Sequence, residues 1–327
     1  MPSKGLISGP RDYAKEKEAA LVRSIGRVVE LRDDRDTGAL GDEVIKMAQA
    51  LILCTLPYRP TDDRQVFRTA RLSDGSTLKV TFTAGLTGVS LAFGNDRTLM
   101  AWLFDKAINS DTPFVTIKNA GEYFRDTGKT RNGKRVKELA ERLRRLTGLI
   151  IGIERIVAGR TQTVMLPVIA ASNLPNNLTI TIDAEENGQS SIPGLENRFG
   201  IQLEERFFQD IKNHHVAIPR RLWARLQGQQ GSPQLQDFMT FFVYRCYCAQ
   251  SETIIPWDSL RQQFPQDDTN RRRFKQNIAK AIRHLRLLWP EARIDVLKEG
   301  VWVNRSTSQL LPEDPTKKRV RRLDATP

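Results

Sequence analysis

Apolar positions in the carboxyl-terminal half of the chain switch between a helical period of 3.6 and a strand period of 2. Between Leu235 and Cys246 they fall at i, i+3, i+4, i+7, i+8 and i+11, which is one face of an amphipathic helix. The segments that follow predict, in order, a strand at 253–255, a helix at 257–264, a helix with its apolar face at 274–289, and a β-hairpin of 293–296 with 301–303. The candidate N-caps of the last helix are Asp267, Asp268 and Thr269.

The earlier half of the chain predicts the same order of elements. These are a helix at 97–108, a strand at 114–117, helices at 119–126 and 131–146, and a hairpin of 149–157 with 162–169. Corresponding apolar residues lie 138 to 140 positions apart, as do Val136 and Phe274, or Phe124 and Phe264. Helix, strand, helix, helix, hairpin is the order of a winged helix. We therefore expect an α+β protein with two tandem winged-helix domains, each of three helices and a β-hairpin wing, and call them the first and second unit.

The remaining segments set the expected domain boundaries. The first domain is predicted at 39–175 and the second at 176–311, between a charged arm at 1–38 and a basic, disordered tail at 312–327. A helix at 43–56 and a hairpin of 64–72 with 77–83 precede the first unit. A strand at 178–182, a loop at 187–197 and a helix at 204–213 lie between the units.

Composition excludes several classes of protein. Of the 327 residues, 39% are hydrophobic, which is enough for packed cores, and three cysteines are too few for a disulfide framework. No apolar run is long enough to span a membrane and no apolar leader is present, so we expect a cytoplasmic protein without a membrane partner.

The net charge of +13 is concentrated in two stretches. Residues 271–305 hold ten Lys and Arg against three acids, and residues 129–145 hold eight against two. Each stretch contains the third helix of its unit. A basic stripe along a helix is the electrostatic footprint of a nucleic-acid-binding protein, so double-stranded DNA is the expected partner.

The third helix of the second unit is the main candidate for DNA contact. No acid interrupts it from Arg271 to Arg286, and Arg and Gln side chains are suited to base edges in a major groove. An ordinary solvated face is the alternative. The candidate DNA-binding residues are Arg271, Arg272, Arg273, Lys275, Gln276, Lys280 and Arg283 on the helix, with Arg293, Lys298 and Arg305 as wing contacts.

The third helix of the first unit carries a mixed charge. Its possible contacts to the DNA backbone are Lys129, Arg131, Lys134, Lys137 and Arg145. Glu138 and Glu141 interrupt this face, and Glu141 is four residues from Arg145, as in a helical ion pair. Backbone contact and a structural or dimer-forming role are equally supported. The apolar hairpins favour self-association of residues 41–169 as a homodimer, with residues 199–305 binding DNA.

The motifs that would indicate an enzyme lack residues or spacings that they require. Gly128-Lys129-Thr130 resembles the end of a phosphate-binding loop, but Tyr123 stands where that motif needs glycine, and the segment joins two helices. The three histidines and three cysteines lack zinc spacing, and His214 and His215 are adjacent residues expected at a helix end. We therefore expect no catalytic residues, no metal and no other cofactor, and a protein that is not an enzyme.

Several short motifs resemble a known family. They are Leu56-Pro57-Tyr58-Arg59, Phe67-Arg68-Thr69-Ala70-Arg71-Leu72, Phe93-Gly94-Asn95-Asp96-Arg97, Ile255-Pro256-Trp257-Asp258-Ser259-Leu260 and Trp289-Pro290-Glu291-Ala292-Arg293. Their order and spacing over roughly 39–305 resemble plasmid replication initiators of the RepA type (the RepA C-terminal family).

The resemblance implies tandem winged-helix domains that bind repeated sequences, called iterons, at a plasmid origin. It also implies opening of the adjacent A·T-rich DNA, recruitment of the host initiator DnaA and the replicative helicase, and plasmid copy control. In that family the second domain reads the iteron and the first mediates dimerisation and backbone contact. Two alternatives stay open: a dimeric winged-helix transcriptional repressor, and a nicking or primase-type replication enzyme.

Overall fold

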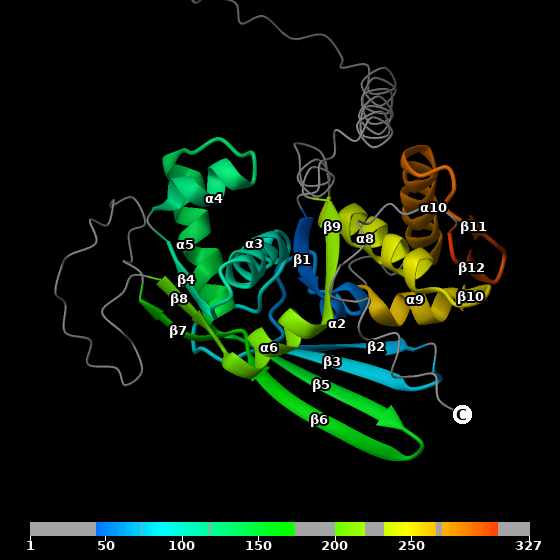
Figure 1. The fold of residues 1–327 in the computed structure, drawn as a ribbon, viewed down its shortest axis with the longest axis horizontal. Helices are drawn as coiled ribbons and strands as arrows, with labels where there is room; N and C mark the ends of the chain where they lie inside the picture. Colours follow the sequence, from blue (N-terminus) through cyan, green and yellow to red (C-terminus); the bar gives the residue numbers. More distant parts are fainter. Residues whose placement is uncertain are drawn as a thin grey trace, which may run out of the picture.

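The computed structural model describes residues 44–72, 74–117, 119–173, 200–219, 232–265 and 270–306. In these ranges the chain is a mixed α+β protein whose sheets are antiparallel, with the first unit on the left of Figure 1 and the second on the right. None of the helices in these ranges is long and apolar enough to cross a membrane. The predicted arm at 1–38, strand at 178–182, loop at 187–197 and tail at 312–327 lie outside the described residues.

The second unit has the predicted order of elements. They are α8 (Pro233–Cys248), β10 (Thr253–Pro256), α9 (Trp257–Gln263), α10 (Arg271–Leu288), β11 (Ile294–Val296) and β12 (Gly300–Val303). Their strands form one sheet in the order β10-β12-β11. The Asn270 side chain caps α10 by accepting from the backbone N–H groups of Arg272 (3.0 Å) and Arg273 (3.2 Å). The predicted caps, Asp267 to Thr269, lie outside the described residues.

The first unit also begins as predicted. Its elements are α3 (Asp96–Asn109), β4 (Phe114–Thr116), α4 (Ala120–Asp126), α5 (Gly133–Thr147), β7 (Ile169–Asn173) and β8 (Gly200–Leu203). Asn132 caps α5 by accepting from the Arg135 N–H at 2.9 Å, and it stands 138 positions before Asn270. The third helices of the two units therefore begin in the same way.

The predicted wing of the first unit is wrong. Its hairpin exists, as β5 (Leu149–Val157) and β6 (Arg160–Pro167), but β5 pairs with the preceding hairpin of β2 (Gln65–Arg71) and β3 (Thr77–Ala84). The result is a separate four-stranded sheet, β2-β3-β5-β6, at the bottom of Figure 1. Strand β4 pairs instead with β8, in the order β4-β8-β7, which matches β10-β12-β11. Strands β7 and β8 lie on either side of residue 175, and the division into domains stays a prediction.

Glycines at equivalent positions begin β8 of the first unit and β12 of the second. Gly200 begins β8 opposite Thr116, and Gly300 begins β12 opposite Pro256. A Cβ on Gly200 would lie 2.6 Å from the Val115 carbonyl oxygen, and one on Gly300 would lie closer still to that of Ile255. Only glycine permits such an approach of two backbones, so both units share this contact.

The segments outside the units also correct a prediction. The expected helix at 43–56 is a strand, β1 (Val44–Ala48), followed by the short helix α2 (Gln49–Leu53). Strand β1 pairs with β9 (His215–Pro219), which follows α6 (Glu205–His214). The helix expected at 204–213 is present as α6. In 43–56 the pairing of β1 with the distant strand β9 overrides the local helical pattern.

The buried apolar side chains of both units form one continuous core. In the second unit Phe238 makes edge-to-face contacts with Phe264 and Phe274, at centroid distances of 4.8 and 5.8 Å. Trp302 on β12 is half-buried, with the Arg293 guanidinium 5.8 Å from its ring centroid.

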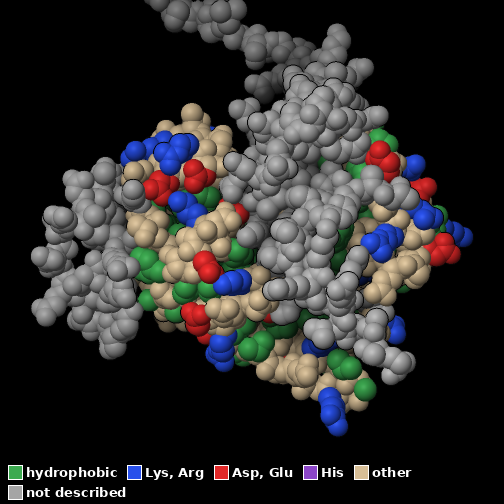
Figure 2. All heavy atoms as spheres, viewed as in Figure 1, with side chains coloured by type: hydrophobic (Ala, Val, Ile, Leu, Met, Phe, Trp, Pro, Cys, Tyr) green, Lys and Arg blue, Asp and Glu red, His purple; other side chains and the backbone are tan. Residues whose placement is uncertain are grey.

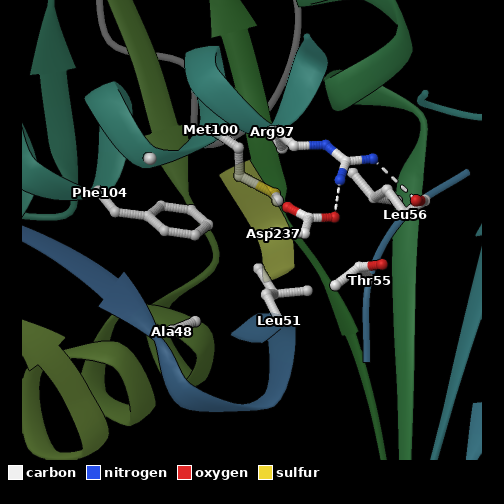
Figure 3. A pocket seen from close by; sticks show the side chains of 9 residues that line it. Ala48, Leu51, Thr55, Leu56, Arg97, Met100, Phe104 and Asp237 are labelled. Carbon is white, nitrogen blue, oxygen red and sulfur yellow. Dashed lines mark hydrogen bonds and ion pairs between the residues drawn. The ribbon is translucent and has the colours of Figure 1, made fainter. Parts of the chain in front are cut away.

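A buried arginine joins the two units, as Figure 3 shows. Arg97 at the start of α3 contacts the carboxylate of Asp237 on α8. It also donates to the carbonyl oxygens of Gly94 (2.8 Å), Leu56 (2.8 Å) and Pro57 (2.9 Å). The cavity beside this pair measures about 20 Å³, room for about one water, so it is part of the packing between units.

Candidate nucleic-acid interface

Packing fixes which face of α10 meets solvent. Phe274, Ile278 and Leu285 are buried, and α10 packs on α8. Side chains on the opposite side of the helix, including Arg272, Gln276 and Arg283, are exposed. All ten residues predicted to bind DNA in the second unit are exposed, as a surface contact requires.

The first turns of α10 face a hollow of about 600 Å³. Its other walls are the start of α9 and the turn between β11 and β12, so it separates the third helix from the wing turn. The hollow brings together five of the predicted residues: Arg271, Arg272, Lys275, Gln276 and Lys298. Residues that are far apart in the sequence thus form one basic, concave surface.

Trp257 fixes the shape of this hollow. Its indole Nε1–H donates to the Lys298 carbonyl oxygen at 3.0 Å, and its backbone N–H donates to the Glu299 carbonyl oxygen at 3.2 Å. The Lys275 ammonium lies 4.8 Å from the centroid of the same indole ring. The wing turn is therefore held at the start of α9, and Lys298 and Lys275 are placed on opposite walls.

Sequence reasoning missed three charged residues of the hollow. Arg261 adds a further cation, while Asp258 and Glu299 add two carboxylates. The contact between Asp258 and Arg271, at 3.7 Å, joins two highly exposed side chains and contributes little stability. In a helix at 257–263, Asp258 and Arg261 are three residues apart and share one face. This spacing could have indicated that both side chains belong to the same surface.

The other predicted residues of the second unit lie outside the hollow. Arg273, Lys280 and Arg283 lie elsewhere on α10, Arg293 lies over Trp302, and Arg305 follows β12. His284 lies on the buried side of α10, where burial and then the charges of Lys280 and Arg283 lower its pKa. The candidate surface is thus longer than the hollow and continues along α10.

The five predicted residues of the first unit differ in exposure. Arg131, Lys134 and Lys137 are exposed and Lys129 is half-buried, and Figure 2 shows Lys and Arg side chains gathered over α4 and α5. Arg145 is different, because its Nε and Nη2 bind the two carboxylate oxygens of buried Asp96, at 2.7 and 2.9 Å. Its pairing with Asp96 replaces the predicted pair with Glu141. Arg145 therefore holds α5 against α3. Its guanidinium binds Asp96 and is not the DNA contact that the sequence predicted.

Comparison with known proteins gives a distant structural likeness. No protein-family model and no curated protein matches the chain. A selenomethionine structure of RctB domains 2 and 3 has a TM-score of 0.48 and 12% identity, over 78% of this chain and 95% of that chain. A second structure of RctB domains 2–3 has a TM-score of 0.45 and 12% identity, over 77% and 94%. These values assign neither a family nor a function.

Proposed function

We propose that this chain is a non-enzymatic plasmid replication initiator that binds repeated DNA sequences at an origin. The observation that carries the proposal is the exposed face of α10. It bears no acid from Arg271 to Arg286, and its first turns lie across a basic hollow from Lys298 of the wing turn. In the proposal the protein also opens the adjacent A·T-rich DNA and helps to recruit host DnaA and the replicative helicase.

Both units are winged-helix modules in this proposal. In the second unit α10 enters the major groove, where Arg272 pairs with guanine and Gln276 with adenine, the geometrically favoured partners of these side chains. Lys298 and Arg305 contact phosphates beside the groove. The shared strand order, β4-β8-β7 and β10-β12-β11, and the equivalent glycines support the duplication.

The first unit serves self-association and backbone contact in this proposal. Its four-stranded sheet exposes Phe67 and Met165, with 62% and 49% of their surfaces accessible, in the same register row as Thr81 and Gly152. Residues directly opposite each other share a face of the sheet, so this face carries an apolar patch suited to a homodimer.

Footprinting of the purified full chain on the DNA that flanks its own gene tests the proposal. We expect protection at regular spacing over direct repeats. Protection of one inverted repeat over a promoter would instead indicate a dimeric repressor. Mg²⁺-dependent cleavage or primer synthesis by the same preparation would contradict a non-enzymatic role.

A further inference from the structure

The turn between α4 and α5 holds a half-buried lysine that no described carboxylate pairs with. Lys129 lies in the Gly128-Lys129-Thr130 segment, and its backbone N–H donates to the Phe124 carbonyl oxygen at 2.7 Å. Its Nζ is 5.7 Å from the ring centroid of Tyr123. Within the described ranges no Asp or Glu forms an ion pair with this ammonium. A charge withdrawn from water in this way is normally paired.

The charged side chains of α5 that act on Lys129 are cations. Burial first, and then the charges of Arg142 and Arg135, lower the pKa of Lys129 to about 8. Arg135 is held over the turn, since its Nη1 donates to the carbonyl and hydroxyl oxygens of Thr130, each at 2.7 Å.

The carboxylates of this region bind Arg142. Asp96 lies 3.9 Å and Glu138 3.7 Å from its guanidinium nitrogens. From α4, the Tyr123 hydroxyl faces the cluster as a neutral group, because burial raises its pKa to about 12. Among the residues that the structure describes, these carboxylates pair with Arg142 and none forms an ion pair with Lys129.

The surrounding sequence extends the positive charge. Residues 127–137 contain no Asp or Glu, and Arg131 and Lys134 are exposed beside the turn. Like charges held together in a partly dry place repel one another, and a bound anion removes that repulsion. Lys and Arg together are the side chains that most often bind phosphate oxygens.

We propose that Lys129 and Arg135 form a binding site for a single phosphate group at the α4–α5 turn. This site is unlike a nucleotide-binding loop, because it joins two helices and relies on side-chain cations. The phosphate comes from a DNA backbone or from a free phosphate ion. The first source rests on the proposed function, whereas the second does not.

The site makes binding depend on pH in a defined direction. A bound phosphate favours the charged ammonium and raises the pKa of Lys129. Affinity is therefore full below about pH 8 and falls as the pH rises above the pKa of the free site. If the bound pKa reaches about 10, the full chain binds a duplex about tenfold more weakly at pH 9 than at pH 7.

The test measures the affinity of the full chain for a duplex without repeats, at pH 7 and pH 9 and constant ionic strength. Lys129→Ala abolishes the difference between the two pH values, and Lys129→Arg keeps strong binding at both. Lys134→Ala removes the same charge from an exposed position and retains the tenfold difference. An unchanged pH dependence in Lys129→Ala and Lys129→Arg, or none in the wild type, overturns the proposal.

Carbon-13 NMR of the labelled lysines identifies the source of the phosphate. A pKa of Lys129 raised by inorganic phosphate alone shows a site for free phosphate, and one raised only by the duplex shows a backbone contact. A pKa that neither probe changes overturns the site. The proposed function assigns sequence preference to α10, so a failure of the phosphate site at Lys129 does not contradict the proposed function.

Discussion

The Arg97 guanidinium contacts the Asp237 carboxylate inside the protein, with 6% and 10% of the two side chains exposed. The pair connects the start of α3 to α8, and three backbone carbonyls accept from Nε and Nη2 of Arg97. The Arg97 guanidinium also lies 4.9 Å from the ring centroid of Tyr58. Fully paired buried charges fix the geometry of their surroundings, so this contact sets how the two units are arranged.

Removing one partner of this pair destabilises the protein strongly. Arg97→Ala leaves Asp237 and three carbonyls without their donor, and we expect a loss of about 3–5 kcal/mol in the free energy of unfolding. Urea denaturation measures it. Arg125→Ala, at a site whose side chain is 75% exposed, is the control and changes stability by less than about 0.5 kcal/mol. Equal midpoints for both variants would show that the buried pair does not join the units.

The core of the second unit has its own test. Phe274→Ala removes the edge-to-face contact with Phe238 and leaves a cavity under α10, so we expect a loss of about 3–5 kcal/mol. Thermal unfolding followed by circular dichroism measures it. If the variant is as stable as the wild type and only DNA binding is lost, the helix is placed with the wrong face inward.

Stability also depends on the protonation of His284. Burial and two nearby cations lower its pKa in the folded protein below the usual histidine value of 6.5. The unfolded chain therefore binds a proton that the folded chain does not, and the free energy of unfolding falls as the pH drops below about 6.5. His284→Gln removes this contribution, so its stability changes less between pH 7 and pH 5. Parallel pH profiles for the two proteins would contradict the assignment.

Local patterns predicted the helices and most of the strands of the two units. The apolar period and an asparagine before the first turn are properties of a short window, as at Asn132 and Asn270. The wing of the first unit depends on pairing between β4 and β8, which lie far apart in the chain. The local sequence carries little information about the register between distant strands. It therefore predicted the adjacent hairpin as the wing.

The candidate site likewise combines features that the local sequence predicts with features that depend on tertiary contacts. The exposed face of α10 follows from helical phase, and the seven residues predicted on this helix are exposed. The hollow depends on how Trp257 holds the wing turn, and the role of Arg145 depends on Asp96, which is 49 residues earlier. Tertiary contacts of this kind decide which cations are free for a ligand and which hold helices together.

Reliance on phosphate contacts predicts a strong effect of salt. The logarithm of the binding constant falls by about 0.9 for each neutralised phosphate per unit of log salt concentration. Lys298→Ala removes one wing contact and lowers this slope by about one unit, with little change in sequence preference. Titrations at several salt concentrations measure the slope. A binding constant that does not respond to salt contradicts the electrostatic role of the wing.

The central claim is that α10 reads a DNA sequence, and competition binding tests it most directly. Arg272→Ala and Gln276→Ala are compared with wild type on a repeat-containing duplex and on a scrambled duplex of equal length. We expect each variant to lose about 1–3 kcal/mol on the repeat and much less on the scrambled duplex. Arg286→Ala, an exposed arginine on the same helix that contacts Asp295, keeps the preference for the repeat. Repeat binding that neither Arg272→Ala nor Gln276→Ala weakens would contradict the claim.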